Sequence, residues 1–289
     1  PKPIFAEPGI TRDGRRLGHA TPARGWPYRH PPSAKCFTMS DTEPWDRTSY
    51  AGYDTARGER LDFLFAPAEV ARIFSGCLAV LLLLHGFVLV MHYGFGHDHM
   101  YGLSEIFNLG NEHSIPTLFA TLTLLSNTLC LFFLYRAEPA GSRMARVWLA
   151  LFLAFAFVTV DEYAVLHERL IRPVRELLDF GGYLYFAWVL PYAALAAALG
   201  LYVLPALWRL GARYRRLFAC AAGSYLLGAL GIEMLGARHY EAVGEQVDLR
   251  YRIFQTVEEI LELTGTIVLL YTLLDLLRDR VRRVTLRAV

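Results

Sequence analysis

The chain has 289 residues, of which 54% are hydrophobic, and a formal net charge of +2. So small a charge gives no reason to expect a nucleic-acid partner. The four cysteines form no C-x-x-C pair, which argues against a zinc ribbon. The first seventy residues are polar, whereas apolar runs of about twenty residues alternate with short charged loops from Ala71 onward. This distribution is typical of an integral membrane protein, so the lipid bilayer is the expected partner.

Residues 1–68 are predicted to form a disordered or loosely structured cytoplasmic segment, because they show no hydrophobic period and are rich in proline, glycine and arginine. The chain does not begin with methionine, whereas Met39 opens a stretch that reads like an ordinary polar N-terminus. We therefore hypothesise that translation starts at Met39 and that residues 1–38 are not translated. The intact mass of natively expressed protein tests this, since a mass that includes residues 1–38 would refute it.

Residues 69–289 are predicted to form an all-α domain of six transmembrane helices, followed by a short arginine-rich cytoplasmic tail. The expected spans lie near 71–93, 114–135, 147–167, 183–208, 217–237 and 255–277. Ser114 and Pro116 are typical of a helix start, at the cap and in the first turn. The fifth span carries four glycines, which allow neighbouring helices to approach closely.

The arginines in the loops predict the orientation. Loops 136–146 and 209–216 and the tail together hold twelve, whereas the alternate loops hold six. Because cytoplasmic loops carry the excess of basic residues, both termini are expected in the cytoplasm.

The ionisable residues of the spans gather at their outer ends. Asp161 and Glu162 end the third span, with His167 and Glu168 just beyond, and Asp161 and Glu168 would lie within about 20° of each other on a continuous helix. A rise of ~1.5 Å per residue puts Asp161 and Glu233 about 21 and 24 Å from the inner ends of their spans. Glu262 lies about 10 Å from an outer end by the same rise, and Glu258 and Glu259 share its stripe. Asp161, Glu233 and Glu262 are therefore all expected in the outer third of the membrane.

Several carboxylates so close together cannot all stay ionised unless a proton, an arginine or a metal ion joins them. The arginines of the outer loops could form ion pairs with them: Arg169, Arg172, Arg238, Arg250 and Arg252. Imidazole and carboxylate together also suit a divalent transition metal such as Zn, Mn or Fe. The proposed metal ligands are Glu112, His113, Asp161, His167, Glu168, Glu233, Glu258 and Glu262, with His239 in the same pool.

A bound metal would allow hydrolysis of a lipid or periplasmic substrate, with a metal-bound water as the nucleophile. No catalytic residue can be assigned, and the spacing matches no known metal motif. The alternative is a non-catalytic membrane protein, or a proton-relay or transport subunit, whose carboxylates pair with arginines. Near-stoichiometric metal in the purified protein would distinguish the first reading from the second.

Two further features lie between the third and fourth spans. Residues 168–179 alternate charged with apolar side chains and are expected to form a short helix on the outer surface, roofing the carboxyls. Tyr183, Tyr185, Trp188 and Tyr192 are interpreted as an interfacial aromatic belt.

Four motifs carry a resemblance to a known family: Glu112-His113-Ser114-Ile115-Pro116-Thr117, the Asp161-Glu162 and His167-Glu168 pairs, Gly231-x-Glu233-x-x-Gly236, and Glu258-Glu259-x-x-Glu262-x-x-Gly265. Over residues 70–277 the chain resembles an uncharacterised family of polytopic bacterial membrane proteins. The resemblance implies an inner-membrane helical bundle and no particular biochemistry.

A fainter similarity links the chain to the intramembrane ceramidase-like hydrolases, in which Ser, Asp and three His form a zinc site. Ser114, Asp161 and the histidines would take those roles. The chain departs from that pattern in having six spans rather than seven, and it lacks H-x-x-x-H on its last helix.

Overall fold

A computed structural model describes residues 60–61, 66–97, 102–280 and 284–285. Almost all of the segment predicted to be disordered, residues 1–68, lies outside these ranges, as does Met39.

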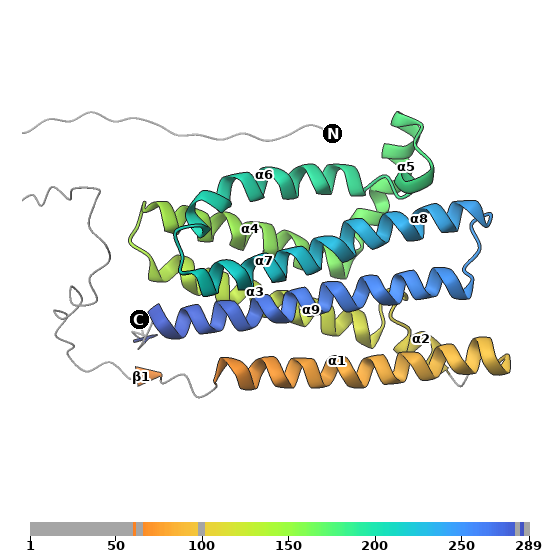
Figure 1. Cartoon of the computed structure of the whole chain (residues 1–289), viewed down its shortest axis with the longest axis horizontal. Helices are drawn as coiled ribbons and strands as arrows, with labels where there is room; N and C mark the ends of the chain where they lie inside the picture. The colour runs from red at the N-terminus through yellow and green to blue at the C-terminus, as the bar shows by residue number, and fades with distance from the viewer. Residues whose placement is uncertain (1–59, 62–65, 98–101, 281–283, 286–289) are drawn as a thin grey trace, which may run out of the picture. The chain divides into compact units, whose positions relative to one another are not determined.

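The described residues form a bundle of long helices (Figure 1). The α-helices are α1 (Pro67–Leu89), α2 (Leu103–Phe107), α3 (Ile115–Ala137), α4 (Arg143–Ala164), α5 (Leu166–Leu178), α6 (Val189–Leu207), α7 (Ala212–Leu226), α8 (Glu233–Ala242) and α9 (Leu249–Arg280). Two π-helical segments, η1 (Val90–Gly94) and η4 (Leu227–Ile232), and one 3-10 turn, η3 (Gly182–Leu184), interrupt or join them. Strands β1 (Arg60–Leu61) and β2 (Val284–Thr285) pair antiparallel.

Six helical segments are long and apolar enough to cross a membrane, which confirms the predicted all-α bundle of six spans. They are Pro67–Gly94, Ile115–Ala137, Arg143–Ala164, Val189–Leu207, Ala212–Ala242 and Leu249–Asp279. The third ends at Ala164 rather than residue 167, and the fourth begins at Val189 rather than residue 183. Both differences fall next to the acidic residues.

Side-chain caps fix the first turns of α3 and α4. Ser114 Oγ accepts the N–H of Thr117 at 3.3 Å, as its position before Pro116 predicts. Ser142 Oγ accepts the N–H of Ala145 at 3.0 Å in the same way.

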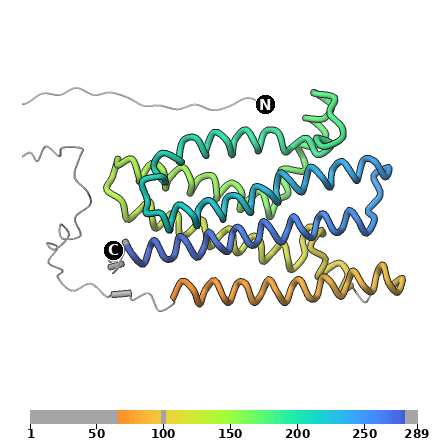
Figure 2. The backbone as a smooth tube through the Cα atoms, viewed as in Figure 1, coloured from red at the N-terminus to blue at the C-terminus, as the bar shows by residue number. Residues whose placement is uncertain are grey.

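Helix α9 lies between α7–α8 on one side and α1 on the other, with α3 also packed against it (Figures 1 and 2). Two glycines allow this packing. A Cβ atom at Gly228 would lie 2.8 Å from the carbonyl oxygen of Glu258, and one at Gly265 would lie 2.8 Å from that of Ala221. The close helix approach predicted from the glycines of the fifth span is therefore confirmed at Gly228.

The two ends of the bundle differ in character. Toward the C-terminus of α9 the core is apolar, formed by Trp148 with leucines that include Leu131, Leu134, Leu270 and Leu273. The acidic residues lie toward the other end of α9, where η4 leads directly into Glu233. A π-helical segment inside a helix often marks a functional site, because the extra residue per turn redirects the side chains that follow.

Candidate functional site

Helix α4 ends in a sharp turn that the sequence did not predict. Val165 has φ 53°, in the left-handed region, and α5 starts at the next residue. Asp161 therefore belongs to α4 and Glu168 to α5, so the expectation that they share one face of a continuous helix is wrong. The turn is held by Asp161 Oδ1, which accepts the backbone N–H of His167 at 2.8 Å.

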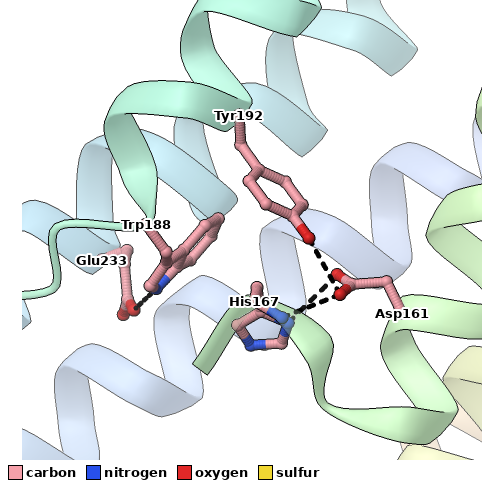
Figure 3. A network of polar contacts seen from close by, with 5 residues as sticks. All are labelled: Asp161, His167, Trp188, Tyr192 and Glu233. Atoms are coloured by element: carbon pink, nitrogen blue, oxygen red, sulfur yellow. Dashed lines mark hydrogen bonds and ion pairs between the residues drawn. The ribbon is translucent and has the colours of Figure 1, made fainter. Parts of the chain in front are cut away.

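Asp161 and His167 form a hydrogen-bonded pair, drawn in Figure 3. His167 Nδ1 lies 3.1 Å from Asp161 Oδ2, and Tyr192 donates its hydroxyl to Asp161 Oδ1 at 2.9 Å. Because a carboxylate accepts hydrogen bonds and cannot donate them, we assign the proton of this contact to Nδ1. Nε2 is then the nitrogen that gains or loses a proton.

Aromatic side chains line the other side of the imidazole. The ring of Trp188 lies 4.8 Å from that of His167, between centroids, and Trp188 Nε1 donates to Glu233 Oε1 at 3.2 Å (Figure 3). Trp188 is buried and Tyr192 half-buried, so the interfacial-belt interpretation is wrong for these two. Tyr185 is also buried, whereas Tyr183 is exposed as that interpretation requires.

Five glutamates from three spans gather beside this pair, and we call them the carboxyl cluster: Glu162 of α4, Glu233 of α8, and Glu258, Glu259 and Glu262 of α9. Each is half-buried. The charges of Glu162 and Glu233 act on both Glu259 and Glu262, and Glu233 and Glu258 interact as a carboxyl pair. The predicted gathering of acidic groups from separate helices is therefore present in the structure.

The arginines of the same end of the bundle bind elsewhere. Arg238 donates to the hydroxyl of Tyr183 and lies over its ring, and Arg252 donates to the carbonyl of Gly110 at 3.2 Å. Within the part of the chain that the structure describes, no arginine forms an ion pair with the carboxyl cluster. The arginine-pairing alternative therefore finds no support there.

Asp275, near the other end of α9, is an acid that does form an ion pair with an arginine, in contrast to the carboxyl cluster. It is buried, lies 2.9 Å from Arg213, and accepts the hydroxyl of Tyr214 at 3.2 Å. Among the described residues, α9 thus carries a buried acid that is paired with an arginine at one end, and carboxyls without an arginine ion pair at the other.

Charge and burial both act on the two titratable groups at the edge of the cluster. Burial lowers the pKa of His167, but the hydrogen bond and charge of Asp161, with Glu162 and Glu168, outweigh it and hold the pKa above its ordinary value. Partial removal from water, followed by the negative charge of Glu168, raises the pKa of Glu112 above its ordinary value.

The loop that carries Glu112 is fixed by a histidine inside the first span. The N–H of Leu109 donates to His85 Nδ1 at 3.1 Å, so His85 Nε2 carries the ring proton and donates to Thr256 Oγ1 at 2.9 Å. His85 is only 2% exposed and joins the loop to α1 and α9.

The proposed metal ligands are thus only partly brought together. Asp161, His167, Glu233, Glu258 and Glu262 lie in or beside the cluster, Glu112 and Glu168 lie at its exposed edge, and His113 is exposed in the adjoining turn. His239 instead lies 2.9 Å from Asp248. Among the described residues, no three or more His, Cys, Asp or Glu side chains are arranged to hold a metal ion.

Four members of the site were missing from the predicted ligand set: Glu162, Glu259, Trp188 and Tyr192. The helical stripe of α9 already grouped Glu259 with Glu258 and Glu262. No comparable signal existed for Trp188 and Tyr192, because aromatic residues at a span end have the same pattern whether they face lipid or the protein interior.

Fold and site together define a class: a six-span integral membrane protein with a carboxyl cluster near one end of its bundle. The chain belongs to a family described as a domain of unknown function (DUF8692), whose model matches residues 76–277. That match begins within α1 and ends within α9, so it includes the cluster. No curated protein and no solved structure gives a significant match.

Proposed function

We propose that this protein binds and exchanges protons at the carboxyl cluster, as a proton-relay or proton-coupled component of the membrane. The observation that carries the proposal is the meeting of five glutamates from three spans with no arginine partner in the described part of the chain. A proton is the partner that every aqueous solution supplies.

The chemistry of neighbouring carboxyls supports proton binding. Like charges at this spacing oppose each other's ionisation, and a charged side chain inside a bilayer costs at least a few kcal/mol. The Glu233–Glu258 pair is an example, because two carboxyl groups can hydrogen-bond to each other only if one of them carries a proton. The cluster is therefore expected to hold fewer negative charges than it has carboxyls.

His167 is placed to pass protons between water and the cluster. Its side chain is 22% exposed, Asp161 fixes its ring, and its charge acts on Glu162 and Glu233. Histidine is the side chain whose ordinary pKa lies closest to physiological pH, which suits a proton donor and acceptor, and Asp161 helps to hold the pKa of His167 above that ordinary value.

We place both termini in the cytoplasm on the arginine bias of the loops, and the spans in a bacterial inner membrane on the resemblance carried by the four motifs. The cluster would then lie in the outer half of the membrane. In that orientation the inner half holds the apolar core around Trp148 and Leu270, and the buried acid described there, Asp275, is already paired with Arg213. Exchange is accordingly expected with the outer side only.

A pH jump on detergent-purified protein, followed with an indicator dye, tests this proposal. We expect fewer protons taken up per chain in Glu258→Gln and Glu262→Gln than in the wild type, because each removes one proton-binding group. The pH jump stays near neutral, where exposed carboxyls remain ionised, so Glu176→Gln on exposed α5 is the matched control and should leave the number unchanged. His167→Gln should slow the uptake. Equal uptake by the wild type and both cluster variants would refute the proposal.

Metal binding by the same carboxyls is the second prediction, with hydrolysis as its possible consequence. Elemental analysis separates the two. A near-stoichiometric transition metal, lost in Asp161→Ala, His167→Ala or Glu262→Ala, would favour the metal site over proton exchange.

A further inference from the structure

Helix α5, between the third and fourth spans, is strongly amphipathic. On a wheel of ~100° per residue its five charged side chains fall within about 120° of arc. They are Glu168, Arg169, Arg172, Arg175 and Glu176. The apolar side chains occupy the opposite arc of about 160°: Leu166, Leu170, Ile171, Pro173, Val174, Leu177 and Leu178.

The apolar face of α5 is only partly covered within the bundle. No residue of α5 is buried, and Leu170, Leu177 and Leu178 are 37%, 80% and 47% exposed. Apolar side chains exposed together on one face of a helix mark a contact with lipid or with another protein.

The position of α5 favours lipid. It directly follows one span, ending at Ala164, and the next begins at Val189, so both of its ends are held near the edge of the membrane. It also runs across the direction of the long helices (Figure 1). A helix lying across the spans at their ends lies along the membrane surface.

His167 shows which way the apolar face points. It falls inside the apolar arc, within about 80° of Leu170 and Leu177 on the wheel. Its side chain contacts Asp161, in the third span, and Trp188, directly before the fourth (Figure 3). The exposed leucines therefore lie on the side of α5 that faces the spans, but they project past the edge of the bundle. The charged face is on the opposite side and points toward water.

We propose that α5 lies in the headgroup region of the bilayer surface nearest the carboxyl cluster, with Leu170, Val174 and Leu177 inserted and its arginines facing lipid phosphates. Interfacial helices of this kind insert about 5–10 Å into the headgroup and acyl boundary. Three arginines against two glutamates give α5 a small positive charge that complements phosphate groups.

The test uses full-length protein in phospholipid vesicles, with native cysteines replaced and one new cysteine labelled with an environment-sensitive fluorophore. Leu177→Cys probes the apolar face, and Glu176→Cys, its exposed neighbour on the charged face, is the matched control. A second pair, Leu170→Cys and Arg169→Cys, repeats the comparison two turns earlier in the same helix.

We expect the label at residue 177 to show blue-shifted emission that is quenched by lipid-attached nitroxides and little by aqueous iodide. The label at residue 176 should show the reverse. Strong iodide quenching at both positions would overturn the proposal by placing the apolar face in water. Shielding at residue 177 from both quenchers, increasing with the protein-to-lipid ratio, would overturn it in favour of a second copy of the chain.

Discussion

The substitution Asp161→Asn tests how the site is held together. Asp161 accepts three hydrogen bonds: from the backbone N–H of His167 at 2.8 Å, from its Nδ1 at 3.1 Å and from the Tyr192 hydroxyl at 2.9 Å. Asparagine has the same shape but only one accepting oxygen. If that oxygen keeps the two bonds made to Oδ1, the bond from Nδ1 and the negative charge are lost. Hydrogen bonds to charged groups contribute about 1.5–3 kcal/mol, so the free energy of unfolding should fall by about 2 kcal/mol while His167 is protonated.

The pH dependence of this loss has a definite sign. The pKa of His167 is above its ordinary value because Asp161 and the nearby glutamates outweigh burial. A raised folded-state pKa contributes stability that is fully present below the unfolded pKa of about 6.5 and is lost as the pH rises through the folded pKa. Asp161→Asn removes that contribution, so the stability difference between wild type and variant should widen as the pH falls.

Chemical unfolding in detergent at several pH values measures the difference, and NMR of histidine-labelled protein follows the titration of His167. Asp248→Asn, which removes the negative charge beside His239, is the control and should leave the titration of His167 unaltered. An unchanged pKa for His167 in Asp161→Asn would refute the argument.

Three further predictions concern the framework of the site. Gly228→Ala should lower the free energy of unfolding by about 1–3 kcal/mol, because its Cβ would lie 2.8 Å from the Glu258 carbonyl oxygen. Gly200→Ala, with open space around it, should not, and thermal unfolding compares the two variants. Val165→Gly should raise the melting temperature or leave it unchanged, because a β-branched residue at φ 53° stores about 1–3 kcal/mol of strain, and a clear fall would contradict that reading. His85→Phe should lower the free energy of unfolding by about 2–4 kcal/mol, because it removes the two hydrogen bonds of the buried imidazole and leaves a backbone N–H unpaired. It should also increase hydrogen exchange at residues 108–110, and unchanged exchange there would contradict the role of His85 in holding the loop.

The spans could be predicted from the sequence because the membrane imposes a simple rule: about twenty apolar residues in a helix. The convergence of the glutamates followed from the same rule, since the depth of Glu233 and Glu262 depends only on helix rise and orientation. Both predictions rest on one-dimensional periodicity, which the sequence contains in full.

The break at Val165 could not be predicted in this way. Valine is disfavoured in the left-handed region, and neither glycine nor proline marks the turn. It forms because Asp161 accepts the N–H of His167, a contact between residues six apart that no local propensity describes. The inward positions of Trp188 and Tyr192 likewise depend on tertiary packing against α4 and α8, so the sequence alone left their partners unidentified.

Infrared spectroscopy tests the central claim most directly, because a protonated carboxylic acid has a C=O absorption that a carboxylate lacks. At neutral pH, where exposed carboxyls are ionised, the wild-type protein should show this absorption, and Glu258→Gln should weaken it while Glu176→Gln does not. If the wild type shows no protonated carboxyl at neutral pH, the cluster holds its negative charges by other means, and proton binding within it is contradicted.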